Sequence, residues 1–168
     1  MKPKTVRRAS GGHSPQQRTC ISHVGLVAGT ILLTSDGEIP VEFLSPGDRI
    51  ITRNAGMVPL RAIETEKIKI EAVRINAGAL GHIKPPHTVM LPASQTVLVR
   101  DWRAKALGGA TQAVMPAGCL VDDEYISSLG PRQMVLIKLG FDAPYVVYAD
   151  GLELSVPAMV AEEAVQAA

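Results

Sequence analysis

The sequence predicts an all-β domain, a compact fold of many short strands with flexible ends. Short apolar runs alternate with turn-forming Gly, Pro, Asp and Ser residues at the spacings typical of a β-sandwich or barrel. Aromatic residues make up only 4% of the chain while hydrophobic residues reach 46%, so Val, Ile and Leu must fill most of the core. At 168 residues the chain is long enough for one well-buried domain.

Composition divides the chain into three parts. We expect residues 1–22 to form a disordered basic arm, residues 23–157 a β-domain and residues 158–168 a C-terminal tail. The first 24 residues hold five basic side chains and no acidic one, although the whole chain has a net charge of only +1. Such an arm is either a solvated terminus, which we favour, or a tail that binds anions or nucleic acid nonspecifically. It has no interleaved aromatic residues for base stacking, so nucleic acid is the weaker expectation.

Turn signals separate the strands expected in the first part of the domain. Residues 31–34 are an apolar run that ends at a Ser-Asp-Gly turn, and residues 38–42 then alternate in polarity. Pro40 has no N–H to donate to a strand ladder, so this second strand should lie at a sheet edge. A Ser-Pro-Gly-Asp turn follows, and residues 49–52 form a third strand.

The rest of the domain continues in the same way. Further strands are expected at residues 58–63, 68–75, 88–91, 96–99, 134–139 and 145–148. Residues 105–115 contain Ala and Gly without a firm period and should form a loop or a short helix.

One block carries a family resemblance. Gly29 and Thr30 are followed at fixed spacing by a set of apolar, turn and acidic residues: Leu32, Thr34, Gly37, Pro40, Val41, Glu42, Leu44, Gly47, Asp48, Ile50 and Thr52. This order resembles the opening block of bacterial Hint (hedgehog/intein) domains, C-x-x-x-G-T-x-I-x-T-x-x-G-x-x-P-V-E-x-L-x-x-G-D-x-V-x-T. Residues 73–81, 92–99 and 145–151 resemble later blocks of that family more loosely. The resemblance implies a Hint-like β-fold and a domain related to self-processing proteins.

The resemblance also implies where the family's chemistry should stand. A Cys or Ser at the head of the first block attacks the preceding carbonyl, and a His in the middle block protonates the departing amide nitrogen. Here Gly25 stands at the first position and Gln95 at the second, and Pro144 replaces a His before the closing strand. No His-Asn dipeptide occurs near the C-terminus. We therefore expect a degenerate member of the family without catalytic residues, and we favour a non-enzyme over an enzyme.

Residues just ahead of the block leave an alternative open. Cys20 and Ser22 carry nucleophilic groups and His23 a titratable one, so residual self-cleavage of an intein-like kind would use them. The two histidines of the Pro85–Pro86 region, His82 and His87, could in principle bind a metal, but their spacing fits a loop better.

Two more features have an ordinary structural interpretation. The acidic triplet at residues 122–124 is expected to be a solvated turn rather than a cation site, and Cys119 a small buried apolar residue. We predict neither a metal nor another cofactor.

The sequence also gives expectations for the location and the partners of the protein. No apolar run is long enough for a signal peptide or a membrane span, so the default is a cytoplasmic protein, although export without a cleaved signal would leave the same sequence. We expect a structural or interaction module with an unidentified protein partner. The sequence does not specify its oligomeric state.

Overall fold

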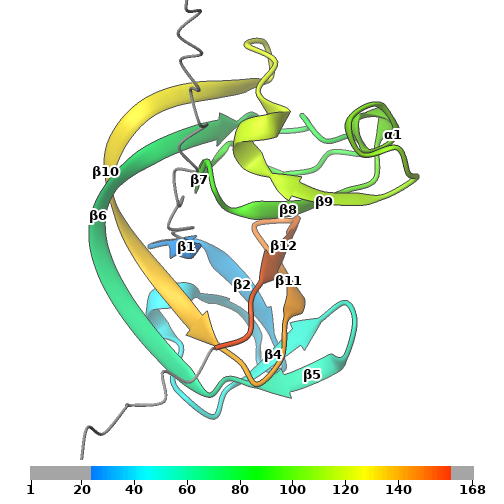
Figure 1. Ribbon diagram of the computed structural model, residues 1–168. Helices are drawn as coiled ribbons and strands as arrows, with labels where there is room; N and C mark the ends of the chain where they lie inside the picture. Colours follow the sequence, from blue (N-terminus) through cyan, green and yellow to red (C-terminus); the bar gives the residue numbers. More distant parts are fainter. Residues whose placement is uncertain (1–23, 160–168) are drawn as a thin grey trace, which may run out of the picture.

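The computed structural model describes residues 24–159 and shows an all-β fold of two sheets (Figure 1). The smaller sheet has the order β1 (Leu26–Val27), β10 (Ile126–Gly140), β6 (Ala62–Ile75) and β7 (Val89–Pro92). The larger sheet has the order β3 (Gly37–Pro40), β2 (Ile31–Thr34), β4 (Arg49–Thr52), β11 (Tyr145–Ala149), β12 (Leu152–Val156), β8 (Thr96–Val99) and β9 (Ala113–Pro116), with β5 (Gly56–Pro59) paired to β4. The predicted fold class is confirmed.

Strands β6 and β10 are the longest elements and form one curved antiparallel pair along a side of the molecule (Figure 1). Ala62 lies opposite Gly140 at one end of the pair and Ile75 opposite Ile126 at the other. The register shifts between Ser128 and Gly130, and Gly130 has a φ of 68°. Such a bulge bends a strand and increases its twist, which helps the pair wrap around the two ends of the domain.

Side chains from both sheets fill a main core, with a smaller cluster beside it. The largest fully buried side chains are Phe141, Leu26, Leu32, Ile50, Leu60, Ile75, Leu120, Ile126, Leu136 and Leu154. A smaller cluster of Ala72, Met134 and Leu136 lies under the long strand pair. Aliphatic residues therefore do most of the packing, as the low aromatic content predicts.

Several element boundaries differ from the sequence-based expectation. The single strand expected at residues 58–63 is two strands, β5 and β6, because Leu60 and Arg61 turn between the sheets and bond to Asp48 and Gly140 through their backbones. The strands expected at 68–75 and 134–139 begin earlier than expected, since polar residues extend β6 and β10 beyond the core. Pro40 does lie in an edge strand, as predicted.

The segment expected to be loop or short helix contains both a helix and a strand. Helix α1 (Trp102–Gly108) begins at Asp101, whose side chain accepts a hydrogen bond from the Arg103 amide, and ends at Gly109 in the left-handed conformation. Strand β9 follows. Strand β12 was also not predicted, although the Asp150-Gly151 turn before it, with φ of 49° and 76°, fits a two-residue hairpin.

The expectation for Cys119 is wrong. The residue lies in the 3₁₀ turn Ala117–Leu120, where Ala117 and Leu120 face the core and the Cys119 side chain is exposed. The expected arm, residues 1–22, and residues 160–168 of the expected tail lie outside the described residues.

The two phenylalanines of the chain give a matched test of this core. Phe141 is 1% exposed and packs edge-on against Tyr145 with ring centroids 5.5 Å apart, whereas Phe43 is 73% exposed. We predict that Phe141→Ala lowers the free energy of unfolding by about 3–5 kcal/mol. Phe43→Ala should change it by less than about 0.5 kcal/mol. Urea unfolding followed by circular dichroism measures both, and equal effects would contradict the packing.

Candidate functional site

A pocket of about 540 Å³ lies where the start of the domain meets one end of the long strand pair. Its walls come from the segment before β1, the first residues of β6, the last residues of β10 and the chain beyond β12. They are lined by Val24, Gly25, Leu26, Ala62, Glu64, Gln95, Ile137, Lys138, Leu139, Gly140, Val156, Pro157, Ala158 and Met159. Gly25 and Gln95, which are 70 positions apart in the sequence, therefore meet in one site.

Gly25 is buried where the chain passes close to β10. A Cβ atom at this position would lie 3.2 Å from the Cβ of Leu136 and 3.4 Å from the carbonyl oxygen of Ile137. A larger residue would fit only if β10 moved by a few tenths of an ångström. The position thus brings backbone to the pocket wall and has no side chain that could react.

Gln95 is one of the residues that line the pocket and is fully buried. Its Nε2 donates to the carbonyl oxygens of Thr96, at 3.1 Å, and Ser155, at 3.0 Å. Its backbone carbonyl accepts from the Ala117 amide at 2.8 Å. Among the described residues Oε1 has no hydrogen-bond donor. The side chain therefore joins β8 to β12 and cannot carry a proton between groups near neutral pH.

Pro144 does not belong to this site. It lies exposed on the loop between β10 and β11, where its carbonyl accepts from Asn54 Nδ2 at 3.3 Å. It is not among the residues that line the pocket. The structure thus brings together two of the three positions that the sequence singles out.

Two charged residues that sequence reasoning missed also line the pocket. Glu64 is exposed on β6, and Lys138 on β10 lies opposite it in register. Lys138 instead pairs with Glu66, with 2.7 Å between Nζ and Oε2. Charged and apolar residues alternate along residues 62–70, which could have indicated a strand with charged residues on one face. That pattern does not show which strand lies opposite, so it could not have placed Glu64 beside Lys138. Within residues 24–159, the lining contains no Cys, Ser, Thr or His.

Comparison with known families decides the relationship. The sequence profile of the Hint domain matches residues 24–155. The chain belongs to the Hint domain family. Among curated proteins no significant match is found.

Two solved structures are similar to this chain at low sequence identity. The solution structure of a bacterial intein-like domain from Clostridium thermocellum is 17% identical, with a TM-score of 0.51 over 80% of this chain and 98% of that one. The crystal structure of the gp41-1 intein is 15% identical, with a TM-score of 0.48 over 77% of this chain and 96% of that one.

The remaining candidate residues from the sequence analysis do not line the pocket. Some lie elsewhere in the domain, and others precede the described residues. Cys20, Ser22 and His23 precede the described residues. His82 and His87 are exposed on the loop before β7, and His87 Nε2 lies 3.4 Å from Asp150 Oδ1. Over residues 24–159 there is no group of three or more His, Cys, Asp or Glu placed to hold a metal ion, and no helix long and apolar enough to cross a membrane.

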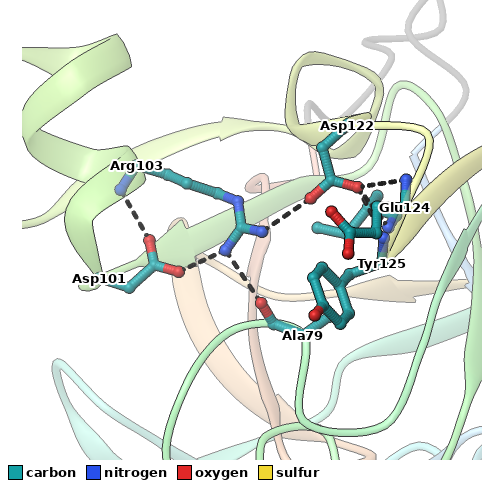
Figure 2. A network of polar contacts seen from close by, with 7 residues as sticks. Ala79, Asp101, Arg103, Asp122, Glu124 and Tyr125 are labelled. Carbon is teal, nitrogen blue, oxygen red and sulfur yellow. Dashed lines mark hydrogen bonds and ion pairs between the residues drawn. The ribbon is translucent and has the colours of Figure 1, made fainter.

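Figure 2 shows the acidic turn at residues 122–124, where the Asp122 carboxylate faces the guanidinium of Arg103. Arg103 is buried between Asp101, at 2.6 Å, and Asp122, at 2.9 Å, and it also donates to the Ala79 carbonyl. Asp122 Oδ1 accepts from the backbone amides of the next turn, including Ile126 at 2.8 Å. Burial raises the pKa of Asp122, but the Ile126 amide and the Arg103 guanidinium outweigh it and hold that pKa far below its ordinary value.

A second charge cluster joins β4, β8 and β12. Glu153 is 7% exposed and accepts hydrogen bonds from Arg53, at 2.9 Å, and from Arg100 Nε, at 3.0 Å. Burial alone raises the pKa of Glu153, yet the hydrogen bond from Arg100 and then that from Arg53 lower it overall. Both clusters pair their charges internally.

The Asp122 interactions give a pH-dependent prediction. Asp122→Ala should lower the free energy of unfolding at neutral pH by roughly 1–3 kcal/mol, because it removes hydrogen bonds to a charged acceptor. Because folding lowers this pKa, the contribution is complete above about pH 4, the range of an unfolded Asp, and is lost as the pH falls toward the folded value. The difference between wild type and Asp122→Ala should therefore shrink on acidification.

Urea unfolding at several pH values measures that difference. Glu124→Ala is the matched control. Glu124 bonds to Asp122 through its backbone amide, which the substitution keeps. A difference that stays constant down to the most acidic pH would show that Asp122 does not stabilise the fold through its charge.

Proposed function

We propose that this Hint domain does not process its own chain and serves as a structural or interaction module. The observation that supports this most is the composition of the pocket where Gly25 and Gln95 meet. Self-processing in the family begins with attack by a side-chain thiol or hydroxyl on the preceding carbonyl. Glycine has neither group, so the first bond cannot form at position 25.

The second position also argues against the reaction. An amide bond breaks only when its nitrogen receives a proton, and an imidazole does this because its pKa lies near neutrality. A Gln side chain has no such proton, and both hydrogens of Gln95 Nε2 already point to carbonyl oxygens. The two positions therefore lack the nucleophile and the acid that the family's chemistry requires.

The frame around the pocket is well packed despite this loss. Leu26, Ile137 and Val156 on its walls are 1%, 3% and 5% exposed, and the long strand pair is continuous beside them. A domain that keeps such packing without reactive groups is suited to hold other parts of a protein or to bind a partner. This is the basis for assigning it a structural or interaction role.

Intact-mass spectrometry of the purified full-length chain tests the proposal. We expect the 17.8 kDa chain to keep its mass through a day in mildly alkaline buffer with dithiothreitol. Any thioester formed at the start of the domain would be captured by the thiol reagent and would release an N-terminal peptide. An unchanged mass supports the proposal.

Appearance of a released peptide would overturn it and favour residual self-cleavage instead. Cys20→Ala and Ser22→Ala are then the informative variants, because these two residues carry the nucleophilic groups just ahead of Gly25 in the sequence. The mass of the fragment identifies the bond that breaks. Loss of cleavage in only one of the two variants would identify the nucleophile.

A further inference from the structure

We propose that the outward face of the larger sheet binds an extended segment of a partner protein in which one acidic side chain precedes alternating apolar ones. The apolar side chains pack along a row of outward-facing residues, and the carboxylate binds in a basic pocket that this row crosses. The inference rests on the proposed function, because it assigns a class of partner to the interaction module.

The larger sheet carries apolar side chains on the face that points away from the core. Residues alternate between the two faces along each strand, so the buried set of β4, β8 and β11 leaves the other set outside. The register of the strand pairs brings six outward residues side by side, which we call the apolar row. In order across β9, β8, β12, β11, β4 and β5 they are Val114, Leu98, Glu153, Tyr148, Ile51 and Met57.

Five of the six residues in the apolar row are aliphatic or aromatic and keep contact with solvent. Val114 and Met57, at its two ends, are each more than half exposed, and the three between them are half-buried. The solvent face of an antiparallel sheet is normally polar. Neighbouring exposed apolar side chains on a folded domain mark an interaction surface, so we expect a partner to cover the row.

A pocket of about 310 Å³, which we call the basic pocket, lies where the row crosses β8 and β12. Leu98 and Glu153 of the row line it, together with residues of the loop before β7 and of the turn before β12. Lys84 and Arg100 are cations of its lining. The basic pocket is therefore continuous with the apolar row and can receive one side chain of a segment bound there.

The two carboxylates that line the basic pocket are already paired. Asp101 is bound by Arg103. Glu153 accepts hydrogen bonds from Arg53 and from both Nε and Nη2 of Arg100. Two guanidinium groups against the one carboxylate of Glu153 leave a net positive charge at the row.

Further positive charge on this face is uncompensated. Lys84 is exposed at the basic pocket and Arg49 is exposed on β4, and neither has an ion-pair partner within residues 24–159. Arg100 uses only Nε and Nη2 for Glu153, which leaves Nη1 for another acceptor. A carboxylate placed in the basic pocket meets an ammonium and a guanidinium group, and charge-assisted hydrogen bonds are stronger than neutral ones.

These charges decide between the possible occupants. A second copy of the chain would bring the same guanidinium groups face to face, which like-charge repulsion opposes. A lipid surface would cover Glu153, a charged group in the middle of the row, with hydrocarbon. An acidic segment of a partner protein matches both the apolar side chains and the net positive charge.

The length of the row matches a short extended segment. Neighbouring strands lie about 4.8 Å apart, so the four steps from Leu98 to Met57 cover about 19 Å. An extended chain rises about 3.3 Å per residue and turns every second side chain to the same face. About six or seven residues therefore span the row, with their alternate side chains against the sheet.

Titration of the intact, isotope-labelled chain with the peptide acetyl-Glu-Ser-Leu-Ser-Leu-Ser-Leu-amide, followed by amide NMR shifts, tests the inference. Its Glu and Leu side chains share one face when the peptide is extended. We expect saturable shifts on β4, β8, β11 and β12. The same peptide with Gln in place of Glu should bind several-fold more weakly, and the peptide with Lys there more weakly still. Equal binding of all three peptides, or shifts confined to the smaller sheet, would overturn the proposal.

Two substitutions at exposed positions separate the contributions. Lys84→Glu should weaken the Glu peptide several-fold and leave the Gln peptide unchanged, whereas Lys67→Glu, exposed on β6 of the smaller sheet, should change neither. Met57→Ser should weaken both peptides by the same factor, because it shortens the apolar row. Met90→Ser, on β7 of the smaller sheet, is its matched control. Equal effects of a variant and its control would overturn the assignment of the surface.

Sedimentation measurements test the other two occupants. The chain is examined alone over a range of concentrations and with vesicles of phosphatidylcholine and phosphatidylserine. Self-association or vesicle binding that disappears in Met57→Ser would overturn the peptide assignment. A monomer that ignores the vesicles and binds the Glu peptide supports it.

The outcomes also distinguish this inference from the proposed function. Intact mass is measured on every sample before and after titration. An unchanged mass without saturable shifts overturns the peptide assignment and leaves the absence of self-processing standing. A reduced mass overturns the proposed function instead.

Discussion

The antiparallel pairing of β6 with β10 determines where both ends of the domain lie. At one end of the pair, opposite Ala62, the last residues of β10 form a wall of the pocket. At the other end, the Asn76 amide donates to the Tyr125 carbonyl and holds the turn that contains Asp122. Strand β1 adds to the outer edge of β10 through Leu26, which places Gly25 beside the pocket. A shift of one residue in this pairing would turn every alternate side chain to the opposite face and destroy both arrangements.

The two residues that the family resemblance singles out both have a structural role in the pocket. Gln95 occupies the place of a proton donor, yet its backbone and Nε2 hold β8, β12 and the turn after β9 together. Gly25 occupies the place of a nucleophile, yet β10 lies so close that even a methyl group would be crowded. Both residues are therefore explained by packing and hydrogen bonding in this chain.

Much of the architecture could be predicted from the sequence because its signals are local. The turns around β2, β3 and β4 contain Gly, Pro and Asp at positions whose backbone conformation needs them, and Pro40 excludes a central strand. The full lengths of β6 and β10 could not be predicted, since their outer parts alternate charged with half-buried residues and contain Pro131. The Asp150-Gly151 hairpin signal was present and would have predicted β12.

The candidate site was harder to predict than the fold. Sequence resemblance pointed to Gly25 and Gln95, but only the folded chain shows that Glu64 and Lys138 line the same pocket and that Pro144 does not. Such neighbours are brought together by strand pairing between distant segments, which no local pattern encodes. Cys119 shows the same limit, because its exposure is decided by how Ala117 and Leu120 pack in a turn of four residues.

The proposed function depends on the claim that the frame of a self-processing domain is retained and that the residues at positions 25 and 95 alone prevent cleavage. The most direct measurement is intact mass of the double variant Gly25→Cys/Gln95→His with dithiothreitol, beside each single variant. The introduced thiol can attack the Val24 carbonyl, and the introduced imidazole can protonate the backbone nitrogen of residue 25 as the amide bond breaks. The account predicts release of residues 1–24 from the double variant and an intact chain in both single variants. A double variant that folds but stays uncleaved would contradict the account, and so would cleavage of the wild-type chain.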